Sequence, residues 1–369
     1  WDWESDGAWD TAFDAAPAAS HRYILPGSYT VTVQVVDLMG AADTASATVT
    51  VTQGIDAGTA VTGPGLPWVL PFRVMDAAVS AASDRLYLTA PAEQRIYVLD
   101  LADGLLEKYF ESPGLPERMA MTPAGDRLYV SQPLAPQSYY DPDVPDGFVA
   151  EFDPVAGTRL RDLAVDLDPY DLAVNGSGKL VVSAGSNQWT AIHAYRLSDG
   201  MLVGQADIRH RSRLAMHPGG DWVYAADTDL SPADIRKYDL RGAGIVSLYD
   251  SRYHGDHRMG GNVYVAPDGT WLLTRGGDVF TSAATQPDDM EYIGALTASL
   301  ATLESSDGFN CAGATLRYYR ISDRSLVQSV PLLAPGIDVV IHAGQAYAVL
   351  EDQSGLVPGS RVQAVPLPE

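Results

Sequence analysis

A single hydrophobic pattern recurs through most of the chain. In residues 214–224, LAMHPGGDWVY, a short apolar stretch leads into Pro-Gly-Gly-Asp, and a second stretch rich in aromatic and β-branched residues follows. Two such stretches separated by a turn predict a β-hairpin. Related sequences occur at 77–87, 119–129, 171–181 and 263–273. The pattern therefore predicts an all-β region built from repeated hairpins.

A third predicted strand follows each hairpin and ends at a turn, as in residues 96–104 (IYVLDLADG) and 192–200 (IHAYRLSDG). Four strands in a repeat of about 40 to 50 residues indicate the blades of a β-propeller. We expect seven blades, at residues 74–114, 115–166, 167–208, 209–255, 256–297, 298–336 and 337–369.

The number of blades depends on residues 277–310, where the repeat is blurred. A long insertion there, in a six-bladed ring, is the alternative. Strand-like stretches at 278–280 and 291–296 favour seven blades. The last unit lacks a fourth strand, and we expect residues 68–74 to supply it and to close the ring.

Residues 1–53 follow a different pattern. Two runs, YTVTVQVV at 29–36 and ASATVTV at 45–51, alternate in polarity and predict half-buried strands. Trp-Asp-Trp at 1–3, His-Arg-Tyr at 21–23 and Pro-Gly-Ser-Tyr-Thr-Val at 26–31 resemble a PKD (polycystic-kidney-disease) domain. This resemblance implies an immunoglobulin-like β-sandwich, truncated here because its first strands should precede Trp1. Those strands would lie outside this chain or come from a neighbouring subunit that completes the sheet.

Residues 54–66 are rich in Gly and Pro, so we expect them to link the sandwich at 1–53 to the propeller at 67–369. In pattern, the propeller resembles YVTN-type or surface-layer propellers, which are related to quinoprotein and lactonase-like folds. Together the two resemblances suggest a bacterial or archaeal cell-surface protein. A fold by itself confers no activity.

The net charge of the chain limits the classes of partner that it is expected to bind. Its 369 residues include 24 Lys and Arg against 47 Asp and Glu, a formal net charge of −23 at pH 7. Nucleic acids and anionic membranes attract basic surfaces, so neither is an expected partner. No stretch reaches the ~18 apolar residues of a membrane span, so we expect no membrane insertion within this chain. The single cysteine, Cys311, excludes an internal disulfide and a Cys-based zinc site.

The acidic segment at 2–10, DWESDGAWD, has the order of an EF-hand-like calcium loop. Acidic residues alternate along it, and Gly7 permits the sharp turn. Phe13 stands where an EF-hand has its last Glu, so a later carboxylate or water would complete the shell. We expect Ca²⁺ here, because clustered carboxylates repel one another unless a cation neutralises them; a solvated acidic turn is the alternative. The expected ligands are Asp2, Glu4, Asp6, the carbonyl of Ala8, Asp10 and Asp14.

Weaker candidates lie in two loops. His254 and His257 form the one histidine pair close in sequence, and such a pair can bind zinc or act as acid and base. Without a third ligand nearby, ordinary loop histidines are the stronger interpretation. A Pro-rich insertion beside Tyr139 and Tyr140 could hold calcium or a sugar ring, or be a solvated loop. Its acidic residues are Asp141, Asp143 and Asp146.

Aspartates at the entries of first strands, such as Asp168, Asp171 and Asp338, are expected near the central channel, where lactonase-like propellers hold a metal. They do not complete the ligand set of such a site. No catalytic residues are identified either, because no nucleophile triad, phosphate loop or acid/base motif is found in the sequence.

We therefore expect a non-catalytic protein that is secreted, extracellular or on the cell surface. Its role would be adhesion, binding or surface or filament assembly. Its partners would be a protein or glycan at the cell surface, or copies of itself. The alternative is a metal-dependent, lactonase- or lyase-like propeller enzyme that uses the channel or the pair His254 and His257.

Overall fold

The computed structural model describes residues 1–3, 5, 7–13, 18–19, 21, 23, 27–37, 39–51, 67–140, 144–228, 231–296, 303–304, 309–311, 314–320, 322–352 and 359–367. These residues form an all-β protein in which the only helical turns are two short 3₁₀ segments, η1 (Pro91–Glu93) and η2 (Gln286–Asp288). Within the described part, no helix has the length and apolar character needed to cross a membrane.

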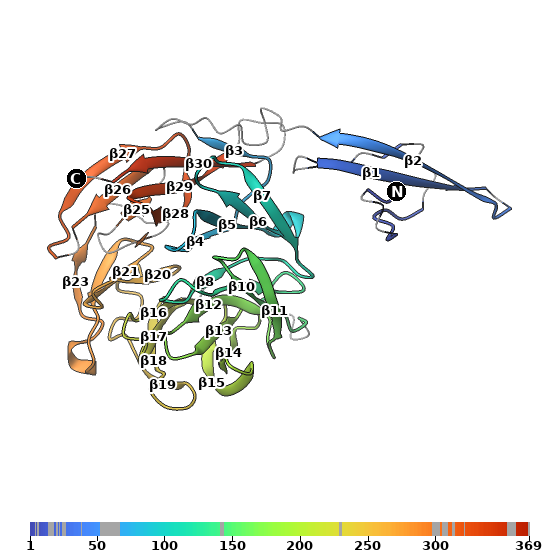
Figure 1. Cartoon of the computed structure of the whole chain (residues 1–369). Coiled ribbons are helices and arrows are strands. Elements are labelled where there is room, and N and C mark those ends of the chain that lie inside the picture. Colours follow the sequence, from blue (N-terminus) through green and yellow to red (C-terminus); the bar gives the residue numbers. More distant parts are fainter. Residues whose placement is uncertain are drawn as a thin grey trace.

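The described strands from residue 68 onward form seven four-stranded sheets arranged as the blades of a propeller (Figure 1). Blades 1 to 4 consist of β4 (Asp76–Val79), β5 (Arg85–Ala90), β6 (Arg95–Asp100) and β7 (Leu106–Glu111); β8 (Met119–Met121), β9 (Leu128–Gln132), β10 (Phe148–Asp153) and β11 (Thr158–Ala164); β12 (Pro169–Val174), β13 (Lys179–Ala184), β14 (Trp189–Arg196) and β15 (Met201–Arg209); and β16 (Arg213–Met216), β17 (Trp222–Ala226), β18 (Ile235–Asp239) and β19 (Val246–Asp250).

Blades 5 to 7 consist of β20 (Val263–Val265), β21 (Trp271–Thr274), β22 (Asp278–Thr281) and β23 (Tyr292–Ala295); β24 (Leu303–Glu304), β25 (Phe309–Cys311), β26 (Thr315–Tyr319) and β27 (Leu326–Pro331); and β28 (Gly336–His342), β29 (Gln345–Asp352), β30 (Gly359–Pro366) and β3 (Trp68–Leu70). All four strands of each blade are among the described residues. Blade 6 is described in part, because residues 297–302, 305–308 and 312–313 lie outside the described residues.

A large side chain opposite a small one explains why the hairpins pack as blades. Tyr87 pairs with Ala78 across the first hairpin, and Tyr129 and Tyr224 pair with alanines in the same way. These tyrosines are at most 1% exposed. In the six blades whose second strand has described burial, that strand is largely buried on both faces because it lies between two neighbouring blades. Burial raises the pKa of Tyr87 to about 12. The tyrosines are therefore blade core, as the repeat predicts.

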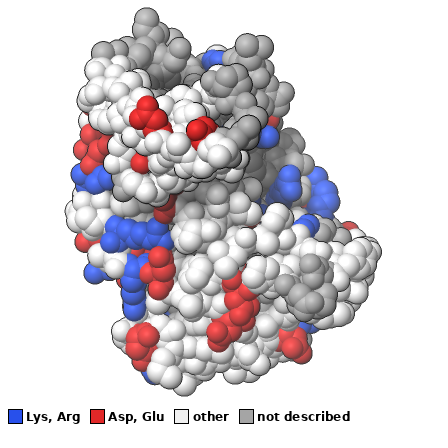
Figure 2. Space-filling model, turned by 90° about the vertical axis from the view of Figure 1, so that its right-hand side faces the viewer, with Lys and Arg blue, Asp and Glu red and all other residues white. Residues whose placement is uncertain are grey.

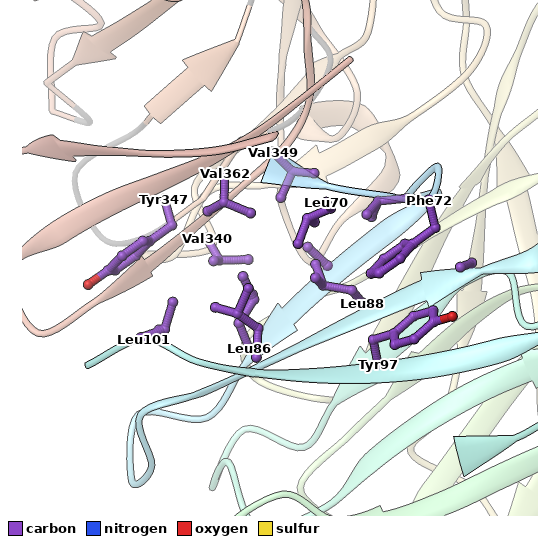
Figure 3. Close-up of a cluster of buried hydrophobic side chains, with 14 residues drawn as sticks. Leu70, Phe72, Leu86, Leu88, Tyr97, Leu101, Val340, Tyr347, Val349 and Val362 are labelled. Atoms are coloured by element: carbon purple, nitrogen blue, oxygen red, sulfur yellow. The ribbon is translucent and has the colours of Figure 1, made fainter. Parts of the chain in front are cut away.

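The ring is closed by a strand from before the first blade. β3 pairs antiparallel with β30, joining Trp68 to Val362 and Leu70 to Ser360. Beyond β3, Phe72 stacks on Tyr97 with ring centroids 3.8 Å apart. Figure 3 shows Leu70, Phe72, Tyr97 and Val362 in one buried apolar cluster contributed by blades 1 and 7. This is the closure expected from residues 68–74.

The described part of residues 1–51 contains an antiparallel pair, β1 (Gly27–Val36) and β2 (Ala42–Val51). An isolated bridge joins Asp2 to Thr32 of β1. The two strands predicted at 29–36 and 45–51 are thus confirmed. A second sheet, which a sandwich requires, is not found among the described residues, and the PKD assignment stays a prediction. The linker predicted at 54–66 lies outside the described residues.

Candidate functional site

A central channel is formed by the first strands of the blades. It encloses a cavity of about 300 Å³ that reaches β4, β12, β16, β20 and β28. Such strands contribute charged and polar side chains to the cavity wall, among them Asp171 and Asp338, as expected from the sequence. Asp168, the third residue of that expectation, is buried but is not among the residues that line this cavity.

Three channel carboxylates bind the neighbouring blade. In each case one carboxylate oxygen accepts a hydrogen bond from a backbone N–H on the next inner strand or at its start. The pairs are Asp76 with Met119 (2.7 Å), Asp171 with Leu214 (2.9 Å) and Asp338 with Ala77 (3.1 Å). We call these contacts the aspartate latches. Each joins two consecutive blades at the channel wall, and the last joins blade 7 to blade 1.

An arginine stands beside two of the latches. Arg118 Nη1 lies 3.6 Å from Asp76 Oδ1, and Arg213 Nη1 lies 3.9 Å from Asp171 Oδ1. Arg213 also lies over the ring of Tyr170, 4.2 Å from its centroid. Each arginine directly precedes the residue whose backbone N–H donates to the aspartate. One aspartate therefore contacts both the guanidinium and a backbone N–H of the next blade.

These latch residues occupy corresponding positions in the inner strands, two residues before Ala78 in blade 1 and before its counterparts elsewhere. Around the described ring this position is occupied by Asp76, Arg118, Asp171, Arg213, Asn262 and, in blade 7, Asp338. Opposite charges therefore alternate across the three borders from blade 1 to blade 4, whereas at the closing border two aspartates meet. Neither arginine was predicted as a channel residue, although RMAM and RLAM place both at the same register of their repeats.

The meeting of two carboxyl groups affects protonation. Burial raises the pKa of Asp76 well above its ordinary value, and Asp338 contributes to this rise, while Arg118 and the N–H of Met119 oppose it. Two carboxyl groups at one site favour retention of a proton by the pair. The channel wall therefore combines an acid pair with two arginines.

The calcium-loop residues are described only in part, since Glu4, Asp6 and Asp14 lie outside the described residues. Asp2 is buried, and its Oδ2 accepts a hydrogen bond from the N–H of Gly7 at 3.0 Å. Asp10 Oδ2 accepts one from the N–H of Trp3 at 2.7 Å. These bonds close residues 2–10 into a loop. Ala8 is exposed within it.

His254 and His257 have separate surroundings. His254 Nδ1 lies 2.8 Å from Asp234 Oδ2, and the side chain is 61% exposed. His257 stacks on Tyr292 with centroids 4.1 Å apart and meets Tyr253 edge to face. The two rings therefore have different partners, which fits loop histidines. Among the described residues, no group of three or more His, Cys, Asp or Glu has an arrangement that could hold a metal ion.

The acidic insertion of blade 2 is described in part. Asp141 and Asp143 lie outside the described residues, and Asp146 is exposed. Tyr139 packs edge to face against Tyr140 and His210, whereas Tyr140 is 87% exposed. The loop thus presents one tyrosine ring to solvent.

Basic and acidic side chains lie close together on the face shown in Figure 2, in small groups separated by uncharged surface. Ion pairs join strands of the same blade. In blade 1, for example, Arg85 Nε lies 2.6 Å from Glu107 Oε2 and Arg95 Nη2 lies 2.9 Å from Glu111 Oε1. Part of the positive charge is therefore neutralised locally.

No known family model matches the chain, and no curated protein matches its sequence. Among solved structures, the chain is similar to one titled Kuenenia stuttgartiensis Hydrazine Synthase, with a TM-score of 0.61 and 12% sequence identity. The similarity covers 83% of this chain and 99% of that one. At this identity the likeness shows the fold alone. The chain therefore contains a β-propeller.

Proposed function

We propose that this protein is a non-catalytic binding or assembly protein located outside the cell or on its surface. The observation that supports the proposal is that the channel carboxylates bind neighbouring blades. Catalytic acids and bases must be able to reach a substrate. Here Asp76, Asp171 and Asp338 each bind the adjacent blade through a backbone N–H. The channel chemistry thus serves to hold the scaffold together.

The N-terminal sheet supports the assembly part of this proposal. Among the described residues, β2 pairs with β1 alone and leaves its other edge open. Val35 is 65% exposed and Val49 is 39% exposed on these strands. An open edge beside exposed apolar residues favours pairing with another strand. We propose that a strand from a second copy of this chain completes a PKD-like sandwich there.

Calcium would stabilise this N-terminal unit. Asp2 and Asp10 both belong to the loop that their hydrogen bonds close, and hard oxygen ligands are those that Ca²⁺ prefers. Binding to the folded state alone raises its stability. The acidic sequence, with Glu4 and Asp6 between those two residues, is what motivates the assignment.

Calorimetry tests the calcium proposal, and size-exclusion chromatography with light scattering tests the assembly proposal. We expect Ca²⁺ to raise the melting temperature of the N-terminal unit and EDTA to lower it, and we expect multimers in size-exclusion chromatography. Asp6→Ala should abolish the calcium effect, whereas Asp43→Ala, in exposed strand β2, should preserve it. A melting temperature that is indifferent to EDTA would remove the calcium proposal. A monomer at all concentrations would remove the assembly proposal.

A metal-dependent enzyme is the second candidate, favoured by the acid pair Asp76 and Asp338 beside Arg118 in the channel. A proton-holding carboxyl next to a cation has the composition of an acid/base site. Metal analysis of the purified protein separates the two candidates. Stoichiometric metal that is lost in Asp338→Asn and retained in Asp6→Ala would favour the enzyme.

A further inference from the structure

A second cavity, of about 190 Å³, lies between blades 3 and 4 and is separate from the channel. Its apolar floor includes Ile208 and Tyr238, which are at most 2% exposed. Trp189 lines this cavity and is 58% exposed. We call it the Trp189 cavity. It thus combines an accessible aromatic side chain with a buried apolar floor.

Trp189 is held in place by its neighbours. It is the first residue of β14 and pairs in register with Arg209, the last residue of β15. The guanidinium of Arg209 lies over the indole ring, 5.6 Å from its centroid. Arg209 Nη1 in turn lies 2.6 Å from Asp227 Oδ2 of blade 4. An aromatic surface fixed in this way loses little freedom when it binds a ligand.

The charged groups of the cavity occur as pairs. Besides Arg209 with Asp227, Arg236 donates to both carboxylate oxygens of Asp250, at 2.9 Å for Nη2 to Oδ2. His254 Nδ1 lies 2.8 Å from Asp234 Oδ2. Each positive group therefore has a carboxylate beside it. An anionic or cationic ligand would have to compete with these pairs.

Paired charges suit a neutral ligand rich in hydroxyl groups. An arginine–aspartate pair keeps further N–H donors and carboxylate lone pairs, so a hydroxyl group can donate to one partner and accept from the other. A sugar ring also has an apolar C–H face, which can stack on an aromatic side chain. We infer that the Trp189 cavity binds one ring of a neutral carbohydrate chain, with Trp189 as the stacking surface.

A third cavity adjoins the Trp189 cavity and extends the proposed binding site. It measures about 550 Å³, is lined by Tyr249, Arg252 and Gln286, and shares Asp250 and His254 with the Trp189 cavity. Since the two cavities have these residues in common, they adjoin. The arrangement points to an oligosaccharide that crosses from the border of blades 3 and 4 toward blade 5. This inference depends neither on calcium nor on self-assembly.

Isothermal titration of the whole chain with malto-, cello-, manno- and chitohexaose tests the inference, with polygalacturonate as a charged comparison. We expect at least one neutral hexasaccharide to bind. Trp189→Ala should weaken its affinity about tenfold or more, as expected for loss of an exposed aromatic anchor. Trp189→Phe should retain most of the affinity. Because Trp189 is exposed, these variants should keep the melting temperature of the parent.

Tyr140→Ala is the matched control, since it removes an exposed aromatic ring from the blade 2 loop. It should leave the affinity unchanged. Three results would each overturn the inference: no binding of any of the four neutral sugars at millimolar concentration, equal affinity in Trp189→Ala, or a preference for polygalacturonate. A loss confined to Tyr140→Ala would move the sugar site to the blade 2 loop.

Discussion

The Lys237 ammonium lies 2.9 Å from a carboxylate oxygen of Asp289, and both side chains are fully buried. The pair joins β18 of blade 4 to the segment that precedes β23 of blade 5. Lys237 Nζ also lies 4.1 Å from the ring centroid of Trp222, and Tyr224 donates a hydrogen bond to Asp289 at 2.8 Å. Desolvation lowers the pKa of Lys237, and Asp289 opposes that shift. Two blades are thus held by one desolvated charge pair.

Removing one partner of this pair should destabilise the protein strongly. Asp289→Asn or Lys237→Met alone leaves a buried charge without its partner, which costs about 3–5 kcal/mol. Urea denaturation measures the change in the free energy of unfolding. The double variant should recover part of the loss, because it removes both charges. Equal losses in the single and double variants would contradict this account. Arg196→Gln, which breaks an exposed pair with Asp199, should have little effect.

The closing border should make stability depend on pH. Because the pKa of Asp76 is raised above 3.8, the folded protein holds a proton that the unfolded chain has released. The stabilisation linked to this proton is complete below the unfolded pKa and is lost as pH rises through the folded pKa. As pH rises from about 4 to about 7, the free energy of unfolding should therefore fall less in Asp76→Asn than in the parent. Urea midpoints across this range measure the effect, and parallel profiles would refute it.

The aspartate latches should depend on the backbone hydrogen bond as well as on charge. Asp171→Asn keeps an oxygen that can accept the N–H of Leu214 but loses the attraction to Arg213. Asp171→Ala loses both and leaves a donor unsatisfied, which costs about 1–3 kcal/mol. We expect the alanine variant to be the less stable of the two in urea denaturation. If the two variants were equally stable, the backbone bond would not be a significant part of the latch.

Ring closure can be tested at Gly104. This residue has a φ of +74°, and a Cβ placed there would lie 2.4 Å from the indole of Trp68. Gly104→Ala should therefore strain the backbone and displace the closing strand, lowering the melting temperature. Gly178→Ala is the control, because its φ of +87° is similar but its surroundings are open. The difference between the two variants measures the steric contact with Trp68. No difference would show that Trp68 yields without cost.

Much of the fold could be predicted because local pairs determine it. Tyr224 faces Ala215 within a single hairpin, and hydrophobic periodicity reveals such neighbours directly. The closure by β3 could also be predicted, since the last unit lacked a strand. The spacing of His254 and His257 in the sequence did not predict their surroundings, because each ring contacts a residue from another segment.

The candidate sites were harder to predict because their members come from different blades. Asp76 and Asp338 are 262 positions apart and meet only when the ring closes. Trp189 and Asp227 line one cavity through the packing of blade 3 on blade 4. No local motif connects such residues. The acidic loop at 2–10, by contrast, is contiguous in sequence, and the calcium assignment made from it stays a prediction.

The closing strand has a mechanical consequence. A pull on the N-terminal sheet would reach the propeller through β3, which pairs with β30 over three residues. Behind it lie Phe72, which is 1% exposed, and Val74, whose N–H donates to the buried Oγ of Ser360 at 2.9 Å. Tension would therefore peel the short strand away first and then meet this buried anchor. Blade 7 would therefore lose its fourth strand, β3, before the force reaches the other blades.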